Sequence, residues 1–485
     1  MLKKPSFNNI LLIGILVLAL AIRLYFFFHT SGQTLWFDEG EYMSTAKHWA
    51  FNLPFNLGPL RPPLFMAFGA LGYILGLGEN ILKFILVLLP SFLLVYCVYL
   101  LGKEMYDERI GLIASFLTAM SWTLLFWTNR FQPDFFSMCF QVLAVFFMWK
   151  YWKTEQTKTI ILAGICAAMG IMFKVSALLV PLSFMIFILF KDRFSAFKNK
   201  NYYWFSLAFI IILIPYFIWS YMTFGTPIGF SNYATSSATL PFDWNVIKFL
   251  PIIAEGILFV LFLAGFVLAL KFLLSIDILI KDKKLLMDPD VFNVIILVLI
   301  TAFYIFYIRN IEDRWVFLWL PFMFMLIGKA LIFVYDFGKK YSKAISVLLV
   351  IGLLAWGGYA QLAHGKAIID AKKDSYLLVK EAALWMKENS EPSDKIFTFS
   401  WTQTTYYAER ETIYNIEGIS NAKEFDEYLQ REKPRYIEIS LFENHPVWLY
   451  QWAEGRSDLQ IVQAYFADKE QKQPLLIVYQ LKEAL

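Results

Sequence analysis

The sequence has little charge and little cysteine. Only 17% of its 485 residues are Asp, Glu, Lys or Arg, while 59% are hydrophobic. This balance excludes a disordered chain and an ordinary soluble domain, in which roughly 45–50% of residues are apolar. The formal net charge of +4 is too small and too scattered to indicate nucleic-acid binding. Three cysteines are too few for a disulfide framework, and because each falls in an apolar run we expect buried thiols at Cys97, Cys139 and Cys166.

Long apolar runs are what the sequence does contain. A transmembrane helix needs roughly 20 mostly apolar residues. Such runs predict a polytopic α-helical membrane protein with about eleven spans, at 10–28, 82–101, 110–127, 134–150, 159–173, 175–190, 203–222, 252–274, 291–308, 315–335 and 343–361. The fifth and sixth runs are short and meet at Lys174, so they either cross fully or form a broken, half-penetrating pair. The first run lacks a small-residue cleavage site, which favours a retained helix over a signal peptide.

The distribution of Lys and Arg predicts the orientation. One set of connections, which includes those after the 134–150 and 175–190 spans, carries eighteen of these residues, and the opposite set, which includes the long first loop, carries seven. Cytoplasmic loops are the ones enriched in Lys and Arg. We therefore expect a cytoplasmic N-terminus and, after an odd number of spans, an extracytoplasmic C-terminal part.

Two segments are then expected outside the membrane on the far face. The first is a long loop at 29–81, with helices that lie along the membrane, inside a transmembrane domain of residues 1–364. The second is the tail at 365–485, where charges become dense and apolar runs shrink to strand length. Helices at 372–389 and 421–432 and strands at 395–401, 436–441, 459–465 and 475–481 predict a small α/β domain.

The segment from Trp36 to Tyr42, in the first external loop, has two interpretations. In one, Asp38 is the N-cap of a helix and Glu41 closes a capping box. In the other, Asp38 is a general base at the membrane edge. The two are compatible, because a capping carboxylate keeps a second oxygen.

Cationic side chains recur where the short far-side loops meet the membrane. Each has a structural interpretation: Arg130 could anchor at headgroup level, Lys174 could extend to the interface, and Arg314 could pair with its neighbouring carboxylates. Arg61 precedes two prolines in what reads as a rigid turn, and Asp134 could complement a helix dipole. The functional interpretation is that the cations bind a phosphate, whose geometry guanidinium matches with two hydrogen bonds.

In this order, the motifs resemble those of the membrane-embedded GT-C glycosyltransferases over most of the first 335 residues. The branch that looks most similar contains the dolichyl-phosphate-mannose protein mannosyltransferases and the lipid A aminoarabinose transferases. The resemblance is carried by Asp38-Glu39, Arg61-Pro62-Pro63-Leu64, the stretch from Arg130 to Asp134, Lys174 and Arg314-Trp315. Many relatives have His where this chain has Arg61. Nothing resembles the Trp-Trp-Asp-Tyr-Gly signature of oligosaccharyltransferases, so block transfer to asparagine is not expected.

The resemblance implies transfer of a sugar from a polyprenyl-phosphate donor to a hydroxyl of a lipid, protein or glycan, on the extracytoplasmic face and with inversion. By the same resemblance Asp38 is the general base, with Glu39 beside it. The donor phosphate is bound by Arg61, Arg130, Lys174 and Arg314, and the acceptor or sugar lies at Asp134, Glu41 and Tyr42. We expect that no cofactor is required. Some relatives use a divalent ion near the acidic loop, for which Asp38 and Asp134 would be ligands, and others do not; the sequence leaves both open. Membrane lipids are the other expected partners, and nucleic acid is not.

Two functions other than sugar transfer were also considered for this sequence. A transporter or lipid flippase would use the charged positions as a translocation path, and a membrane scaffold would use the outer domain to bind a partner. Transporters often show internal repeats and charges near the midplane. We find no repeat, and the charges gather at one face, which favours the enzyme.

Overall fold

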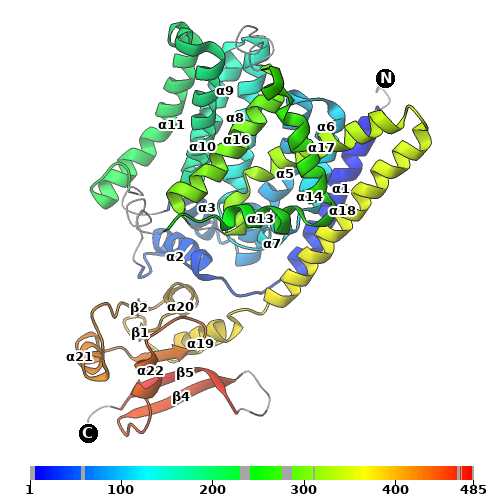
Figure 1. The fold of residues 1–485 in the computed structure, drawn as a ribbon. Helices are drawn as coiled ribbons and strands as arrows, with labels where there is room; N and C mark the ends of the chain where they lie inside the picture. Colours follow the sequence, from blue (N-terminus) through cyan, green and yellow to red (C-terminus); the bar gives the residue numbers. More distant parts are fainter. Residues whose placement is uncertain are drawn as a thin grey trace.

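The computed structural model describes residues 6–55, 61–229, 241–275, 287–309, 312–466, 470 and 472–482. Figure 1 shows a bundle of membrane helices and, beyond one end of it, a smaller domain that contains the only β-strands of the described residues. The long helix α18 (Lys343–Lys372) connects them. It runs past residue 364, the boundary expected between the two parts.

The bundle begins with α1 (Phe7–His29), and the first loop then forms α2 (Phe37–Phe51) and α3 (Leu64–Ile74). The remaining helices of the bundle, with their shorter 3₁₀ and π segments (η), are α4 (Glu79–Lys83), η1 (Phe84–Leu88), α5 (Leu89–Met105), α6 (Glu108–Met120), α7 (Trp122–Trp127), α8 (Asp134–Thr154), α9 (Thr157–Phe173), η2 (Val175–Leu178), α10 (Leu179–Asp192), η3 (Arg193–Lys198), α11 (Lys200–Phe224), α13 (Asn245–Ala254), α14 (Gly256–Ala269), η4 (Leu270–Ser275), α16 (Pro289–Ala302), η6 (Phe303–Ile308), η7 (Asp313–Val316) and α17 (Trp319–Gly338).

Nine helical segments of the described residues are long and apolar enough to cross a membrane. They coincide with nine of the eleven predicted spans. The other two predicted spans are helical but shorter: the run at 110–127 is divided between α6 and α7 at Ser121, and α9 has 17 residues. Lys174 has an extended backbone and separates α9 from η2, so the fifth and sixth runs are two helices. The prediction of a polytopic helical protein is confirmed.

The interior of the bundle is apolar and closely packed. Cys97, Cys139 and Cys166 are buried free thiols, as predicted. Glycines set the closest helix contacts: a Cβ at Gly164 would lie 2.6 Å from a backbone oxygen of α11, and one at Gly102 would lie 2.8 Å from the Gly111 Cα. Lipid supplies no hydrophobic force between membrane helices, so the helices are held together by close packing. Small residues such as glycine allow that close packing.

The C-terminal domain is an α/β unit, as predicted. Its elements are α19 (Leu377–Glu388), β1 (Lys395–Phe397), α20 (Trp401–Ala408), β2 (Glu411–Ile413), α21 (Ala422–Glu432), β3 (Tyr436–Ser440), α22 (Val447–Trp452), β4 (Leu459–Phe466) and β5 (Pro474–Leu481). The sheet has the strand order β2-β1-β3-β5-β4, in which β1 is parallel to β2 and β3, and β5 is antiparallel to β3 and β4.

Two predicted boundaries in this domain are wrong. The strand predicted at 395–401 ends at Phe397, because Thr398 Oγ1 accepts the Ser400 backbone N–H at 3.0 Å in a bend that leads into α20. The helix predicted at 372–389 is divided, since α18 ends at Lys372 and α19 begins at Leu377. The strand β2 and the helices α20 and α22 were not predicted; β2 and α22 have only three and six residues.

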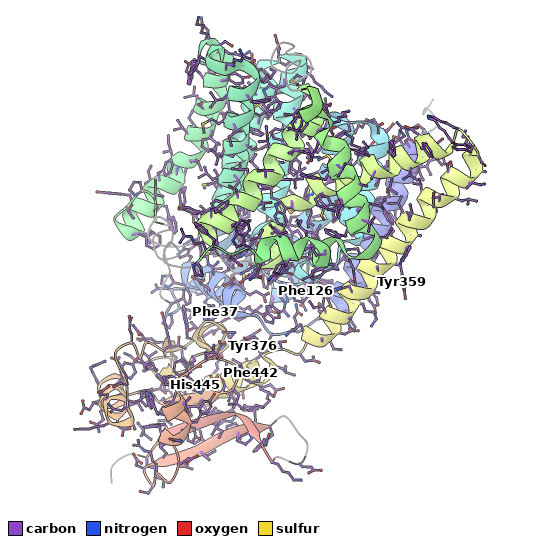
Figure 2. The ribbon with its side chains drawn as sticks, viewed as in Figure 1. Phe37, Phe126, Tyr359, Tyr376, Phe442 and His445 are labelled. Atoms are coloured by element: carbon purple, nitrogen blue, oxygen red, sulfur yellow. The ribbon has the colours of Figure 1, made fainter. Side chains whose placement is uncertain are left out.

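The helix α2 lies between the two domains and fixes how they meet. It packs against α3 on one side and α20 on the other. A Cβ at Gly40 would come within 2.7 Å of the Thr402 carbonyl carbon, so only glycine permits this approach of α2 to α20. Figure 2 shows Phe37, at the start of α2, at the boundary between the domains, and its ring contacts that of Trp401 at 5.4 Å. The helix is therefore buried between protein elements and does not lie freely on the membrane surface.

A buried ion pair holds the start of α2 against the rest of the bundle. Arg130 Nη1 donates to Glu39 Oε2 at 3.1 Å, and the two side chains are 2% and 1% exposed. Glu39 Oε1 also accepts the backbone N–H of Phe131 at 2.6 Å. The Arg130 guanidinium lies 3.8 Å from the centre of the Trp36 ring and donates to the Thr34 carbonyl. Both charges are paired and make further hydrogen bonds, which is the condition for keeping an ion pair in an apolar interior.

We predict that Arg130→Met destabilises the protein by about 3–5 kcal/mol, because it leaves the Glu39 carboxylate buried without its cation. The double variant Glu39→Gln/Arg130→Met should recover part of that loss. Thermal unfolding in detergent measures both. The control is Arg109→Met, since Arg109 and its partner Asp107 are 51% and 41% exposed and should contribute less than about 1 kcal/mol. Equal losses for Arg130→Met and Arg109→Met would contradict this role.

Candidate active site

The first turn of α2 leaves the Asp38 carboxylate free to point away from the helix. The predicted capping box is wrong: Trp36 is the N-cap, and Glu39 caps the turn by accepting the Trp36 backbone N–H at 2.8 Å. Asp38 is therefore the second residue of the helix and makes no capping bond. The helix thus starts two residues earlier than predicted, and the two adjacent acids have different surroundings. Glu39 faces the bundle interior, whereas Asp38 faces other charged side chains.

The Asp38 carboxylate bridges two arginines that are far apart in the sequence. Arg61 Nη2 donates to Asp38 Oδ1 at 2.7 Å, and Arg314 Nη2 donates to Asp38 Oδ2. Arg61 also donates from Nε to Glu41 Oε2 at 2.9 Å and from Nη1 to the Tyr42 hydroxyl at 3.2 Å. Four of the predicted site residues on the first loop and one before α17 thus form a single connected group.

Burial and charge act in opposite directions on Asp38. Burial alone would raise the pKa of its carboxyl group, but the positive charges of Arg61 and Arg314 outweigh burial and hold the pKa below its ordinary value. Asp38 is therefore a carboxylate at neutral pH. Its side chain is 19% exposed, so solvent or a small substrate can reach it.

Lys174 and Asp134 form a second charged pair beside this group. Lys174 Nζ donates to Asp134 Oδ1. Both residues line a narrow pocket together with Arg314, Tyr304 and other residues of α8, α10, α16, η2, η6 and η7. Arg314 belongs both to the pocket and to the group around Asp38, so it joins the two.

Arg130 and Glu39 are the predicted site residues that the structure places elsewhere. Both are enclosed in the ion pair described above, and Arg130 does not line the pocket. The sequence could not separate Arg130 from Arg314, because both lie where a loop meets a span. The difference is the indole ring of Trp36, which covers the Arg130 guanidinium.

Several residues around Arg314 were not predicted. Its Nη1 donates to Gln132 Oε1 at 2.8 Å, and its guanidinium lies 5.1 Å from the centre of the Trp127 ring. The Trp127 indole N–H donates in turn to Asp313 Oδ2 at 3.0 Å. Gln132 lies inside the Arg130–Asp134 motif and could have been included. Trp127 carries no sequence signal, because it is one aromatic residue among many in an apolar run.

Within the described ranges, no three His, Cys, Asp or Glu side chains are grouped so that they could hold a metal ion. Asp38 and Asp134, the expected ligands if an ion is used, are held by Arg314 and Lys174. A divalent ion bound by both carboxylates would compete with these cations.

Comparison with known proteins identifies a similar family and similar solved structures. Residues 60–219 match the sequence profile of the family described as dolichyl-phosphate-mannose-protein mannosyltransferase. That match covers a third of the chain and includes Arg61, Arg130, Asp134 and Lys174. No curated protein sequence matches the chain significantly.

Solved structures show the same fold at low sequence identity. ArnT from Cupriavidus metallidurans, bound to undecaprenyl phosphate, is 12% identical with a TM-score of 0.70, covering 96% of this chain and 98% of ArnT. The Archaeoglobus fulgidus oligosaccharyltransferase AglB, in complex with an inhibitory peptide and a dolichol-phosphate, is 13% identical with a TM-score of 0.65, covering 90% and 70%. Arabinofuranosyltransferase AftD from Mycobacteria is 14% identical with a TM-score of 0.57, covering 96% and 40%.

The three solved structures belong to glycosyltransferases, and the family profile is that of a glycosyltransferase as well. The predicted resemblance is therefore confirmed, and the chain is a multi-pass membrane protein with the fold of the GT-C glycosyltransferases.

Proposed function

We propose that the protein transfers a sugar from a polyprenyl-phosphate donor to a hydroxyl acceptor. The observation that carries this proposal is the convergence of Asp38, Arg61, Lys174 and Arg314, from four separate segments, at one end of the helix bundle beside a pocket. The family profile supports a lipid-linked sugar donor. So do the titles of two similar structures, one bound to undecaprenyl phosphate and one to a dolichol-phosphate.

The position of the cations suits a lipid-linked donor. A polyprenyl chain partitions into the bilayer, so its phosphate meets the protein at headgroup level, where the helix ends lie. The leaving phosphate gains negative charge in the transition state, and preorganised cations stabilise that charge most effectively at a site partly closed to water. Arg314 and Lys174 line the pocket and are 11% and 24% exposed, so we assign them to the phosphate.

Asp38 is the residue that we assign to the acceptor. In the described state both of its oxygens accept from arginines, which lowers its basicity. A donor phosphate that binds Arg314 competes with Asp38 for the same guanidinium. One Asp38 oxygen is then released and becomes a better base at the moment when the donor is present.

The transfer then follows from this arrangement. Asp38 accepts the proton of the acceptor hydroxyl while that oxygen forms a bond to the anomeric carbon. The bond from this carbon to the phosphate oxygen breaks, and its electron pair leaves with the phosphate, which Arg314 and Lys174 hold. Attack opposite the leaving phosphate inverts the anomeric centre. Glu41 and Tyr42, both bonded to Arg61, lie beside Asp38 and are assigned to positioning the acceptor or the sugar.

The site is proposed to lie on the extracytoplasmic face, with the N-terminus in the cytoplasm. The described cations of the predicted cytoplasmic set lie at the connections that follow α5, α8, α10, α14 and α17; Lys3, Lys4, Lys281, Lys283 and Lys284 lie outside the described residues. Because cytoplasmic loops are the basic ones, this distribution supports the orientation. The alternative of a transporter has no comparable support, since the charges of the site pair with one another at one end of the bundle.

We predict that Asp38→Asn lowers the rate of sugar transfer about 10²–10⁴-fold, because the acceptor proton loses its base. The KM for the donor should not rise, since the substitution removes a competitor for Arg314. Transfer would be measured in detergent with polyprenyl-phosphate hexoses and pentoses as donors. The matched control is Asp374→Asn, an exposed aspartate outside the site. A wild-type rate in folded Asp38→Asn protein would remove Asp38 as the base.

We also predict that a cysteine placed at Val447, which is 76% exposed in the C-terminal domain, reacts with a membrane-impermeant maleimide on intact cells. A cysteine at Phe194, 85% exposed at the other end of the bundle, should react only after permeabilisation. The native cysteines are buried and provide a low background. The opposite labelling pattern would reverse the orientation and place the site in the cytoplasm.

A further inference from the structure

Asp313 is an acidic residue of the candidate site to which the proposed transfer assigns no role. It begins η7, directly before Arg314. Its Oδ2 accepts the Trp127 indole N–H at 3.0 Å and the Thr123 hydroxyl at 3.3 Å, and its Oδ1 accepts the Arg314 backbone N–H at 3.0 Å. These three donors are neutral groups. Hydrogen bonds to a carboxylate are stronger than bonds between neutral groups, so Asp313 fixes these donors firmly.

The Trp127 ring is the wall against which the Arg314 guanidinium lies. The guanidinium carbon is 5.1 Å from the centre of the ring and over its face, which is within the range of a cation–π contact. Trp127 is 6% exposed, and its ring also packs at right angles against that of Trp36 at 5.9 Å. An indole can turn about its outer side-chain torsion, and the hydrogen bond to Asp313 selects the orientation that presents a face to Arg314.

The short helix α7 presents Thr123 and Trp127 on one face, because residues four apart on a helix lie one above the other. Asp313 accepts from both, so one carboxylate fixes the helix at two points. The start of α7 has a second attachment, since the Trp122 backbone N–H donates to Gln361 Oε1 at 2.9 Å. The loss of Asp313 would therefore release the Trp127 ring more than it would move the helix.

The orientation of Arg314 matters most when a donor is bound. In the transfer proposed above, the donor phosphate takes the place of Asp38 on the Arg314 guanidinium. That guanidinium also donates from Nε to Glu312 Oε2 at 2.6 Å and from Nη1 to Gln132 Oε1 at 2.8 Å. Glu312 is 45% exposed, so water screens its ion pair, whereas Gln132 is 2% exposed. The Trp127 ring and Gln132 are thus the buried surroundings that hold Arg314 after Asp38 is displaced.

We propose that Asp313 is a positioning residue, which through the Trp127 ring holds the Arg314 guanidinium in the orientation that binds the donor phosphate. This inference rests on the proposed function, in which Arg314 binds that phosphate. A guanidinium that is already oriented loses less conformational freedom on binding, so the phosphate is bound more tightly. Asp313 acts through Trp127 and is not a catalytic residue.

The test is a double-mutant cycle in the purified full-length protein, with binding of undecaprenyl phosphate measured by native mass spectrometry. Trp127→Phe keeps a ring beside Arg314 and every charge of the site, but it removes the indole N–H. It should weaken binding about tenfold, at the lower end of the effects known for groups that orient metal ligands. In the Asp313→Ala protein, which already lacks the acceptor, the same substitution should weaken binding less than about threefold, because both changes remove one hydrogen bond.

Transfer kinetics provide a second measurement. Trp127→Phe should raise the KM for the donor by the same factor as it weakens lipid binding, and it should leave the KM for the acceptor unchanged, since Arg314 is assigned to the phosphate. Thermal unfolding checks that each variant is folded. If Asp313→Ala does not fold, Asp313→Leu takes its place in the cycle, because leucine has a similar shape and no acceptor.

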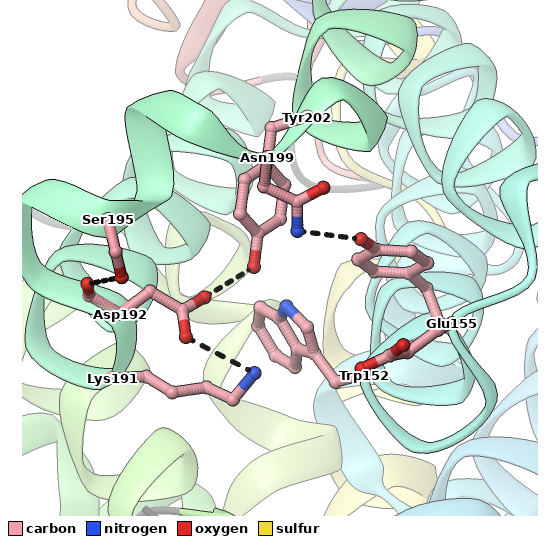
Figure 3. Close-up of a pocket in the computed structure, with 8 residues that line it drawn as sticks. Trp152, Glu155, Lys191, Asp192, Ser195, Asn199 and Tyr202 are labelled. Carbon is pink, nitrogen blue, oxygen red and sulfur yellow. Dashed lines mark hydrogen bonds and ion pairs between the residues drawn. The ribbon is translucent and has the colours of Figure 1, made fainter.

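Two controls remove the same kind of bond elsewhere. In the C-terminal domain, the Trp452 indole N–H donates to Asp426 Oδ1 at 2.9 Å, and the Arg456 guanidinium lies 4.7 Å from the centre of the Trp452 ring. In the membrane domain, the Tyr202 hydroxyl donates to Asp192 Oδ2 at 2.8 Å, in a polar cavity beside the end of α8 that is farther from the site (Figure 3). Trp452→Phe and Tyr202→Phe should leave binding of undecaprenyl phosphate unchanged.

The outcomes separate this inference from the proposed function. An equal effect of Trp127→Phe with and without Asp313, or an equal loss of affinity in Trp452→Phe, would overturn the positioning role and leave the proposed function standing. A wild-type protein that does not bind undecaprenyl phosphate would overturn the proposed function and this inference with it.

Discussion

The bridge from Asp38 to Arg61 and Arg314 is the interaction on which the site depends. Two guanidinium groups so close together would repel each other strongly in a partly buried place, and the carboxylate between them turns that repulsion into attraction. The bridge also joins three parts of the chain: the helix α2, the turn before α3, and the start of η7. Without the Asp38 carboxylate, mutual repulsion and the cost of desolvation would oppose the convergence of these cations at the membrane edge.

The charged residues of the site end of the bundle divide into two groups by their surroundings. Arg130 and Glu39 are buried and hydrogen-bonded to each other, and the Trp36 ring covers the Arg130 guanidinium, so this pair fixes the start of α2. Arg314 and Lys174 are partly exposed, and each holds a carboxylate that a phosphate could replace. An anion-binding site needs fixed surroundings when the anion displaces a carboxylate from its cation. The buried pair of Arg130 and Glu39 provides such a fixed support beside Arg314 and Lys174.

Much of the fold could be predicted from the sequence, since the apolar runs mark the membrane helices and the change in composition at the tail marks the α/β domain. The limits of short elements could not be predicted. Ser121 interrupts one span, and the strand expected at 395–401 ends at Phe397, because a hydroxyl–backbone hydrogen bond at Thr398 bends the chain. Seven of the nine predicted site residues converge. The sequence could not show that Arg130 and Glu39 face inward, because that depends on where Trp36 packs. It could not show the role of Trp127 either, because a single aromatic residue in an apolar run carries no signal of its contacts.

The most direct test of this account is a structure of the protein with a polyprenyl phosphate bound, determined in lipid nanodiscs. The account predicts phosphate density in contact with Arg314 and Lys174, an Asp38 carboxylate separated from Arg314, and an unchanged pair between Arg130 and Glu39. Phosphate density elsewhere on the bundle, with the bridge from Asp38 to Arg314 intact, would contradict it.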